Sequence, residues 1–129
     1  MPLWRRIYST VWLAFLSCVL ISRLLGAHVG TVVHVILGLM LLIVTVSNAR
    51  SLSALAVPER LKRISKVTAG FAIFQMLNGL ALGTIMHLSI NLPRIPSILH
   101  GVHVVCALTI LAQASSVATA YDMWEEKEF

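Results

Sequence analysis

Charge is scarce in this sequence. Only 12% of the 129 residues are Asp, Glu, Lys or Arg, whereas 58% are hydrophobic. Soluble domains average about 25% charged and roughly 45–50% apolar residues, and a chain this short cannot bury so much apolar surface in one soluble core. The composition argues against a disordered chain, a soluble enzyme and a nucleic-acid-binding domain. The only two cysteines, Cys18 and Cys106, both lie inside apolar runs and indicate neither a disulfide framework nor a CxxC redox pair.

Four apolar segments are each long enough to cross a bilayer, which takes about 20 residues per helix. They span about 7–27, 29–48, 66–91 and 95–120. Their glycines and their lack of strict apolar–polar alternation favour helices over barrel strands. The short connection at Gly26–Gly30 makes the first two segments antiparallel neighbours, and Pro93 and Pro96 separate the last two. Pro58 could begin a short amphipathic lead-in through Arg60, Lys62 and Arg63.

The sequence therefore predicts an all-α integral membrane protein, folded as a single domain over residues 1–129. Its expected architecture is an antiparallel bundle of four transmembrane helices. Arg5 and Arg6 before the first apolar run also fit a signal peptide, but the length of the run and the absence of an A-x-A site favour a retained helix.

Basic residues predict the orientation of this bundle. Eight of them fall on one side of the expected membrane, namely Arg5, Arg6, Arg50, Arg60, Lys62, Arg63, Lys66 and Lys127. Only Arg23 and Arg94 fall near the other side. The positive-inside rule then puts both termini in the cytoplasm, and we expect the plasma membrane as the location. The net charge of +5 thus reflects topology and a lipid bilayer partner, and we expect no nucleic-acid partner.

All five histidines fall in the outer half of the expected bundle: His28, His34, His87, His100 and His103. Ionisable side chains within a membrane are costly, and they usually face the bundle interior and serve a function. Glycines accompany them at helical spacing. Gly30 and Gly38 flank His34 at intervals of four residues, and Gln75, Gly79, Gly83 and His87 form a second such stripe. Small residues there either let helices pack closely or leave room for a flat ring beside an axial ligand.

Imidazole is a common axial ligand of haem iron, and helix bundles build such sites from side chains on facing helices. We therefore predict a haem held between His34 and a histidine of the fourth segment, either His100 or His103. Gly38, Gly83 and His87 are candidates to line the haem. Arg23 and Arg94 could pair with the haem propionates, although Arg94 could equally be a solvated loop residue and Arg23 could extend to the interface.

Other interpretations of the histidines are a zinc or copper site and simple packing without a ligand. No acid lies in the outer half, because Glu59, Asp122, Glu125, Glu126 and Glu128 all fall on the cytoplasmic side. This excludes carboxylate acid–base chemistry near the histidines.

Several short motifs resemble those of the haem A synthases. The segment His34–Gly38, followed by LMLLIVTVSNAR, is similar to the family's H-R-x-L-G stretch. The run Gln75–Thr84, then Leu92-Pro93, then Leu99-His100 is similar to its Q-x-x-x-G, L-P and H progression. Members of this family look like two fused four-helix bundles, and this chain resembles one of the two halves over most of its length.

The resemblance implies a b-type haem bound by histidines near the outer ends of the second and fourth helices. These positions carry over onto His34 and His100, with His103 as the alternative because Ala107 follows it at the His-x-x-x-small spacing. The family's glutamate three residues before the second-helix histidine is replaced here by Thr31, and Val35 stands in place of its arginine. The sequence therefore leaves open whether the chain converts haem O to haem A.

The leading hypothesis is a bis-histidine membrane haem protein. Its role would lie in haem A biosynthesis and cytochrome oxidase assembly, or in membrane electron transfer. We expect a homo-oligomer (a dimer or larger) or association with respiratory-complex subunits. Two alternatives are a haem-free structural or assembly subunit and a histidine-lined metal carrier. A second site using His28 and His87 is a further alternative.

Overall fold

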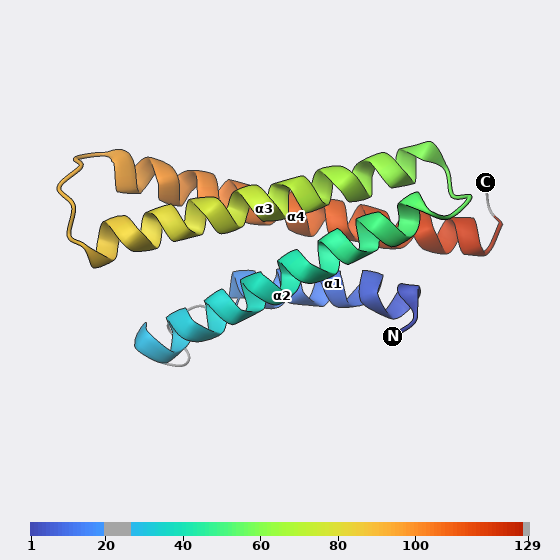
Figure 1. Cartoon of the computed structure of the whole chain (residues 1–129), viewed down its shortest axis with the longest axis horizontal. Helices are drawn as coiled ribbons and strands as arrows, with labels where there is room; N and C mark the ends of the chain where they lie inside the picture. Colours follow the sequence, from blue (N-terminus) through green and yellow to red (C-terminus); the bar gives the residue numbers. More distant parts are fainter. Residues whose placement is uncertain (20–26, 128–129) are drawn as a thin grey trace.

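The computed structural model of the protein describes residues 1–19 and 27–127. It contains four helices: α1 (Leu3–Val19), α2 (Ala27–Ser53), α3 (Glu59–His87) and α4 (Ile95–Glu125). Both chain termini and the connection from α2 to α3 lie at one end of the molecule (Figure 1), which we call the terminal end. The loop from α3 to α4 lies at the opposite, distal end. Successive helices are therefore antiparallel.

The four helices form a closed ring of neighbours. Helix α1 packs against α2, α2 against α3, α3 against α4, and α4 against α1. Within the described residues, α2 and α4 are thus diagonal partners that face each other across the bundle interior. Figure 1 also shows α2 diverging from the α3–α4 hairpin toward the distal end.

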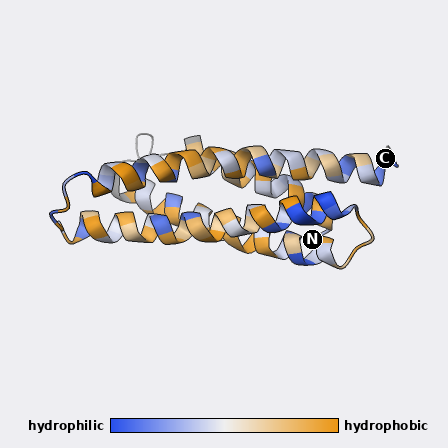
Figure 2. Ribbon diagram, turned by 90° about the horizontal axis from the view of Figure 1, so that it is seen from above, coloured by the Kyte–Doolittle hydropathy of each residue, from blue (hydrophilic) through white to orange (hydrophobic). Residues whose placement is uncertain are grey.

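Within the described residues, three helices are long and apolar enough to cross a membrane: α2 from Val29 to Ser53, α3 and α4. Large apolar side chains point outward along them, including Ile43 on α2, Leu80 on α3 and Val105 on α4. Figure 2 shows apolar residues around the helices over most of their length. This arrangement suits a lipid environment, and the all-helical prediction is confirmed, with three helices long and apolar enough to cross a membrane. Part of the predicted first segment, 7–27, lies outside the described ranges, and Arg23 is in that part.

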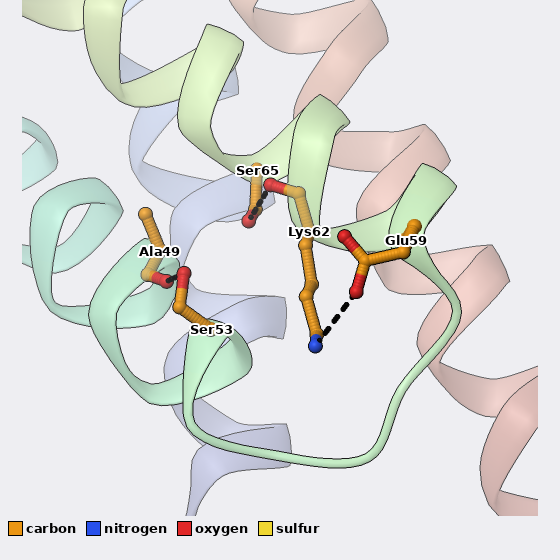
Figure 3. Close-up of polar contacts among 5 residues, drawn as sticks. All are labelled: Ala49, Ser53, Glu59, Lys62 and Ser65. Atoms are coloured by element: carbon orange, nitrogen blue, oxygen red, sulfur yellow. Dashed lines mark hydrogen bonds and ion pairs between the residues drawn. The ribbon is translucent and has the colours of Figure 1, made fainter.

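The helix boundaries differ from the predicted segments mainly at the terminal end. Helix α3 begins at Glu59 rather than near residue 66, because Pro58 precedes its first turn and the basic lead-in continues directly into the apolar part. Helices α2 and α4 extend to Ser53 and Glu125 instead of ending near residues 48 and 120. These extra turns carry polar contacts, such as the exposed pair of Lys62 Nζ and Glu59 Oε1 at 2.9 Å (Figure 3).

At the distal end, α3 stops at His87 rather than near residue 91. Ser89 then adopts a left-handed conformation with φ of 51°, and Arg94 does so with φ of 84°. Pro96 lies in the first turn of α4, where its missing N–H costs no helical hydrogen bond. The reversal between the two helices is therefore complete within residues 88–94.

The bundle interior is layered along its length. An apolar terminal cluster consists of Ile7, Leu52, Val57, Leu61, Val117, Ala118 and Tyr121. Next comes a polar layer of Thr10, Thr45, Asn48, Ser65 and Thr68, all buried. A second apolar group, the central cluster, contains Ala14, Leu41, Cys106 and Ile110. His34 and His103 follow on the distal side of the central cluster, so the histidines are separated from the terminal end by alternating apolar and polar layers.

Replacing Leu61 with Ala should reveal which surfaces of α3 pack inside the protein. Leu61 is 2% exposed, whereas Leu80 on the same helix is 56% exposed. We expect Leu61→Ala to lower the free energy of unfolding by about 2–5 kcal/mol because it opens a cavity. Leu80→Ala should change it by less than about 0.5 kcal/mol, since that side chain faces lipid in both states. Reversible unfolding in mixed micelles measures both; equal effects would contradict the arrangement described here.

Candidate functional site

Two histidines from diagonal helices meet in the bundle interior. The imidazole of His34 on α2 and that of His103 on α4 have ring centroids 5.9 Å apart, with their planes inclined by 59°. Both side chains are half-buried. The Nδ1 atom of each ring is fully buried and has no hydrogen-bond partner among the described residues. Buried polar atoms are nearly always hydrogen-bonded, so two adjacent unsatisfied imidazole nitrogens mark a site that requires a ligand or a water.

Helix α3 fixes how α4 presents its histidine. Gln75 Nε2 donates a hydrogen bond to the backbone carbonyl of His103 itself, at 2.8 Å. One turn away, Asn78 Nδ2 donates to the carbonyl of Leu99, at 3.1 Å. A helix carbonyl has a second lone pair available for such a bond. Together the two amides hold α4 in one rotation and one height relative to α3.

Gly79 allows the close approach of α3 to His103. A Cβ atom at Gly79 would lie 3.2 Å from His103 Cε1 and 3.8 Å from its Nδ1. At that distance the imidazole would have to move by a few tenths of an ångström. The Gln75–Gly79 part of the predicted stripe therefore borders the histidine pair, with Gln75 binding the backbone and Gly79 making room for the ring.

The other predicted small residues have different surroundings. A Cβ at Gly38 would contact Met76 Cε at 3.7 Å, an ordinary van der Waals distance. A Cβ at Gly83 would meet nothing within 4 Å, and Gly83 is exposed. Neither glycine is thus in steric contact with the histidine pair, although Gly83 leaves open space on α3 one turn beyond Gly79.

His103, and not His100, is the histidine of α4 that faces His34. Three residues along an α-helix change the direction of a side chain by about 60° and its height by about 4.5 Å. With α4 held by Gln75 and Asn78, this offset leaves His100 exposed. On geometry, His103 therefore replaces His100 as the partner of His34.

The remaining predicted site residues lie apart from the pair. His87 is exposed in the last turn of α3, and Arg94 is exposed in the loop before α4. His28 falls in the first turn of α2, but its side chain lies outside the described part of the structure, as does the whole of Arg23. The structure therefore assembles a compact pair of histidines and does not bring the other described candidates to it.

Asn78 is the residue that the sequence analysis missed. It is 6% exposed and bonds to α4, although it lies in a segment composed mainly of apolar and small residues. An amide in the middle of an apolar segment is the signal that could have identified it, because a buried amide needs a partner.

The spacing of the two rings suits a metal between them. Two imidazoles bound on opposite sides of one metal, each at a metal–nitrogen distance of about 2 Å, would have ring centres roughly 6 Å apart. The observed 5.9 Å agrees with this spacing. Among residues 1–19 and 27–127, no third His, Cys, Asp or Glu joins a group able to hold a metal ion. A bis-histidine haem takes two imidazoles from its protein, whereas structural zinc sites use four protein ligands.

Comparison with protein-family models, with curated proteins and with solved structures finds no match for this chain.

Alanine substitutions at Gly79 and Gly83 test the close approach to His103. Replacing Gly by Ala inside a helix normally stabilises it by about 0.5–1 kcal/mol. We expect that gain for Gly83→Ala, where the Cβ enters open space, and we expect Gly79→Ala to lose it because the Cβ displaces the imidazole. Unfolding without added haem measures both variants, and the NMR signals of His103 should shift only in Gly79→Ala. An equal gain in both would contradict the contact.

Proposed function

We propose that this protein is an integral membrane haem protein in which His34 and His103 are the two axial ligands of a b-type haem. The observation that carries the proposal is the pair of buried imidazole nitrogens, unsatisfied and on rings with centroids 5.9 Å apart, on the diagonal helices α2 and α4. Diagonal helices leave the bundle interior between them, and a flat cofactor in a helix bundle occupies that kind of space.

The packing of the diagonal helices supports the assignment. Within the described residues, the backbones of α2 and α4 approach those of α1 and α3 and not each other, so α2 and α4 meet only through side chains such as those of His34 and His103. Gly79 removes a side chain beside His103, and Gly83 leaves space on the same face of α3. His87 and Arg94 are exposed at the distal end and lie apart from the pair.

Bound haem supplies one-electron redox chemistry, with both axial positions of the iron taken by protein. Two histidine ligands leave no open coordination position for a substrate, so this site favours membrane electron transfer over conversion of the haem itself. A role in haem A biosynthesis or cytochrome oxidase assembly, which the resemblance to haem A synthases implies, would need a second haem position. A homo-oligomer, or a complex with respiratory subunits, could supply that position.

The charge distribution supports a plasma-membrane protein with both termini in the cytoplasm. Arg5, Arg50, Arg60 and Arg63 lie at or near the terminal end of the described structure, while Arg94 lies at the distal end. Lys and Arg are retained preferentially on the cytoplasmic side. The histidine pair would then lie in the outer half of the membrane.

Absorption spectra of the detergent-purified protein test the haem assignment. After reduction with dithionite, the wild-type protein should show sharp α and β bands, and a pyridine haemochrome should identify haem b. His34→Ala and His103→Ala should each lose these bands, because a low-spin haem needs both ligands. His100→Ala is the matched control on α4 and should retain them.

Two outcomes would contradict the proposal in different ways. Loss of the bands in His100→Ala with retention in His103→Ala would make His100 the axial ligand. A featureless spectrum after haem is supplied to folded protein would leave the haem-free structural or assembly subunit as the alternative. Circular dichroism of each variant distinguishes a lost ligand from a lost fold.

Fusion reporters test the orientation. Green fluorescent protein fused after the C-terminus should fluoresce, and alkaline phosphatase at the same position should be inactive, because the phosphatase requires export to fold. The reverse pattern from both reporters would place the terminal end outside and contradict the positive-inside assignment.

A further inference from the structure

The polar layer encloses a second site, distinct from the histidine pair. Five buried polar side chains from three helices line it: Thr10 on α1, Thr45 and Asn48 on α2, and Ser65 and Thr68 on α3. Each is at most 4% exposed. They surround a cavity of about 10 Å³ whose remaining walls are Ile7, Ala114 and Val117. One water molecule needs about that much space.

The hydroxyl hydrogens in this layer are already used. Each hydroxyl donates to a carbonyl of its own helix: Thr10 to Arg6 at 2.9 Å, Thr45 to Leu42 at 2.9 Å, Ser65 to Lys62 at 2.9 Å and Thr68 to Ile64 at 2.8 Å. The Thr68 hydroxyl has a second acceptor within reach, Gln113 Oε1 on α4 at 3.2 Å, which competes for the same hydrogen. Figure 3 shows the bond from Ser65. A hydroxyl has one hydrogen and two lone pairs. The hydroxyls therefore present acceptor lone pairs, and not donors, to the cavity.

Asn48 adds one more acceptor. Its Nδ2 donates to Thr10 Oγ1 at 2.9 Å. This amide orientation is required, because the hydrogen of Thr10 is donated to Arg6 and its oxygen must accept. Asn48 Oδ1 is then left buried without a partner among the described residues. An unsatisfied buried carbonyl oxygen costs about 1–3 kcal/mol, so a donor at this point would be bound strongly.

We propose that a single water molecule occupies this cavity and donates hydrogen bonds to Asn48 Oδ1 and to a hydroxyl oxygen of α3. The water joins the α1–α2 hairpin to the α3–α4 hairpin in the half of the bundle nearer the terminal end. A small cation would also suit a set of acceptor oxygens, but it would be an uncompensated charge. The acids in the described part of the chain, Glu59, Asp122, Glu125 and Glu126, all lie at helix ends.

Apolar clusters flank the water on both sides along the bundle axis. The terminal cluster lies between it and the nearer end of the bundle, and the central cluster lies between it and the histidine pair. Because Asn48 Oδ1 has no other partner among the described residues, we expect a fully occupied site that does not depend on whether haem is bound.

High-resolution structure determination and NMR of the full-length protein test the site directly. A map that resolves ordered water should show one peak within hydrogen-bonding distance of Asn48 Oδ1. The Asn48 side-chain amide should give a cross-peak to a bound water. An empty cavity in such a map, together with no cross-peak, would overturn the proposal.

Variants and salts distinguish a bound water from a bound cation or an empty cavity. Asn48→Leu should lose the peak, whereas Thr119→Val, which removes an exposed hydroxyl bonded to its own helix, should retain both the peak and the cross-peak. If Asn48→Leu does not fold, the wild-type map and cross-peak still decide the question. Thermal unfolding midpoints should be equal in sodium, potassium and choline chloride at one ionic strength. A rise specific to sodium, with a peak coordinated at ion distances, would show a cation and overturn the assignment to water.

Discussion

The side-chain amides of α3 set the geometry on which the rest of the site depends. In lipid, helices gain little from hiding apolar surface against one another, because the acyl chains are equally apolar. Rotation of a helix is then decided by close packing and by the few polar contacts between helices. The bonds from Gln75 and Asn78 to backbone carbonyls of α4 are contacts of this kind. They do not require a particular side chain on α4, so they fix the height and rotation of that helix independently of its sequence.

Polar residues inside the bundle are few, and each group has a distinct place. Near the terminal end, hydroxyls satisfy themselves on their own helices and leave lone pairs facing inward. Nearer the distal end, the amides of α3 satisfy carbonyls of a neighbouring helix, and the imidazoles are left with unsatisfied nitrogens. The cost of unsatisfied groups in a low-dielectric interior is high. Asn48 Oδ1 in the first of these places and the two imidazole nitrogens in the second are buried without a partner among the described residues, and a bound species is therefore expected at each.

The sequence predicted much of the fold because the apolar segments are long and proline separates the last two. The start of α3 was predicted less well, near residue 66 instead of Glu59. Pro58 directly precedes the helix, and its basic first turns continue into the apolar part without a break. His34 was identified correctly as a residue of the interior, whereas spacing alone could not decide between His100 and His103. That choice depends on the rotation of α4, which is set by Gln75 and Asn78 on another helix. The polar layer was missed because isolated Ser and Thr are common in apolar helices and their grouping appears only when three helices are brought together.

The central cluster makes the two ends of the bundle interior unequal. This cluster forms an apolar barrier between the histidine pair and the terminal end, and it consists of Ala14, Leu41, Cys106 and Ile110. The one hydrogen-bonding side chain of this cluster, Cys106, is directed to the Phe71 carbonyl oxygen at 3.7 Å, so the cluster offers no continuous chain of hydrogen bonds for protons. A redox centre held by the two histidines would then exchange protons with only one of the two aqueous phases. Its midpoint potential would follow the pH of that phase, and a pH gradient across the membrane would act on it from one side alone.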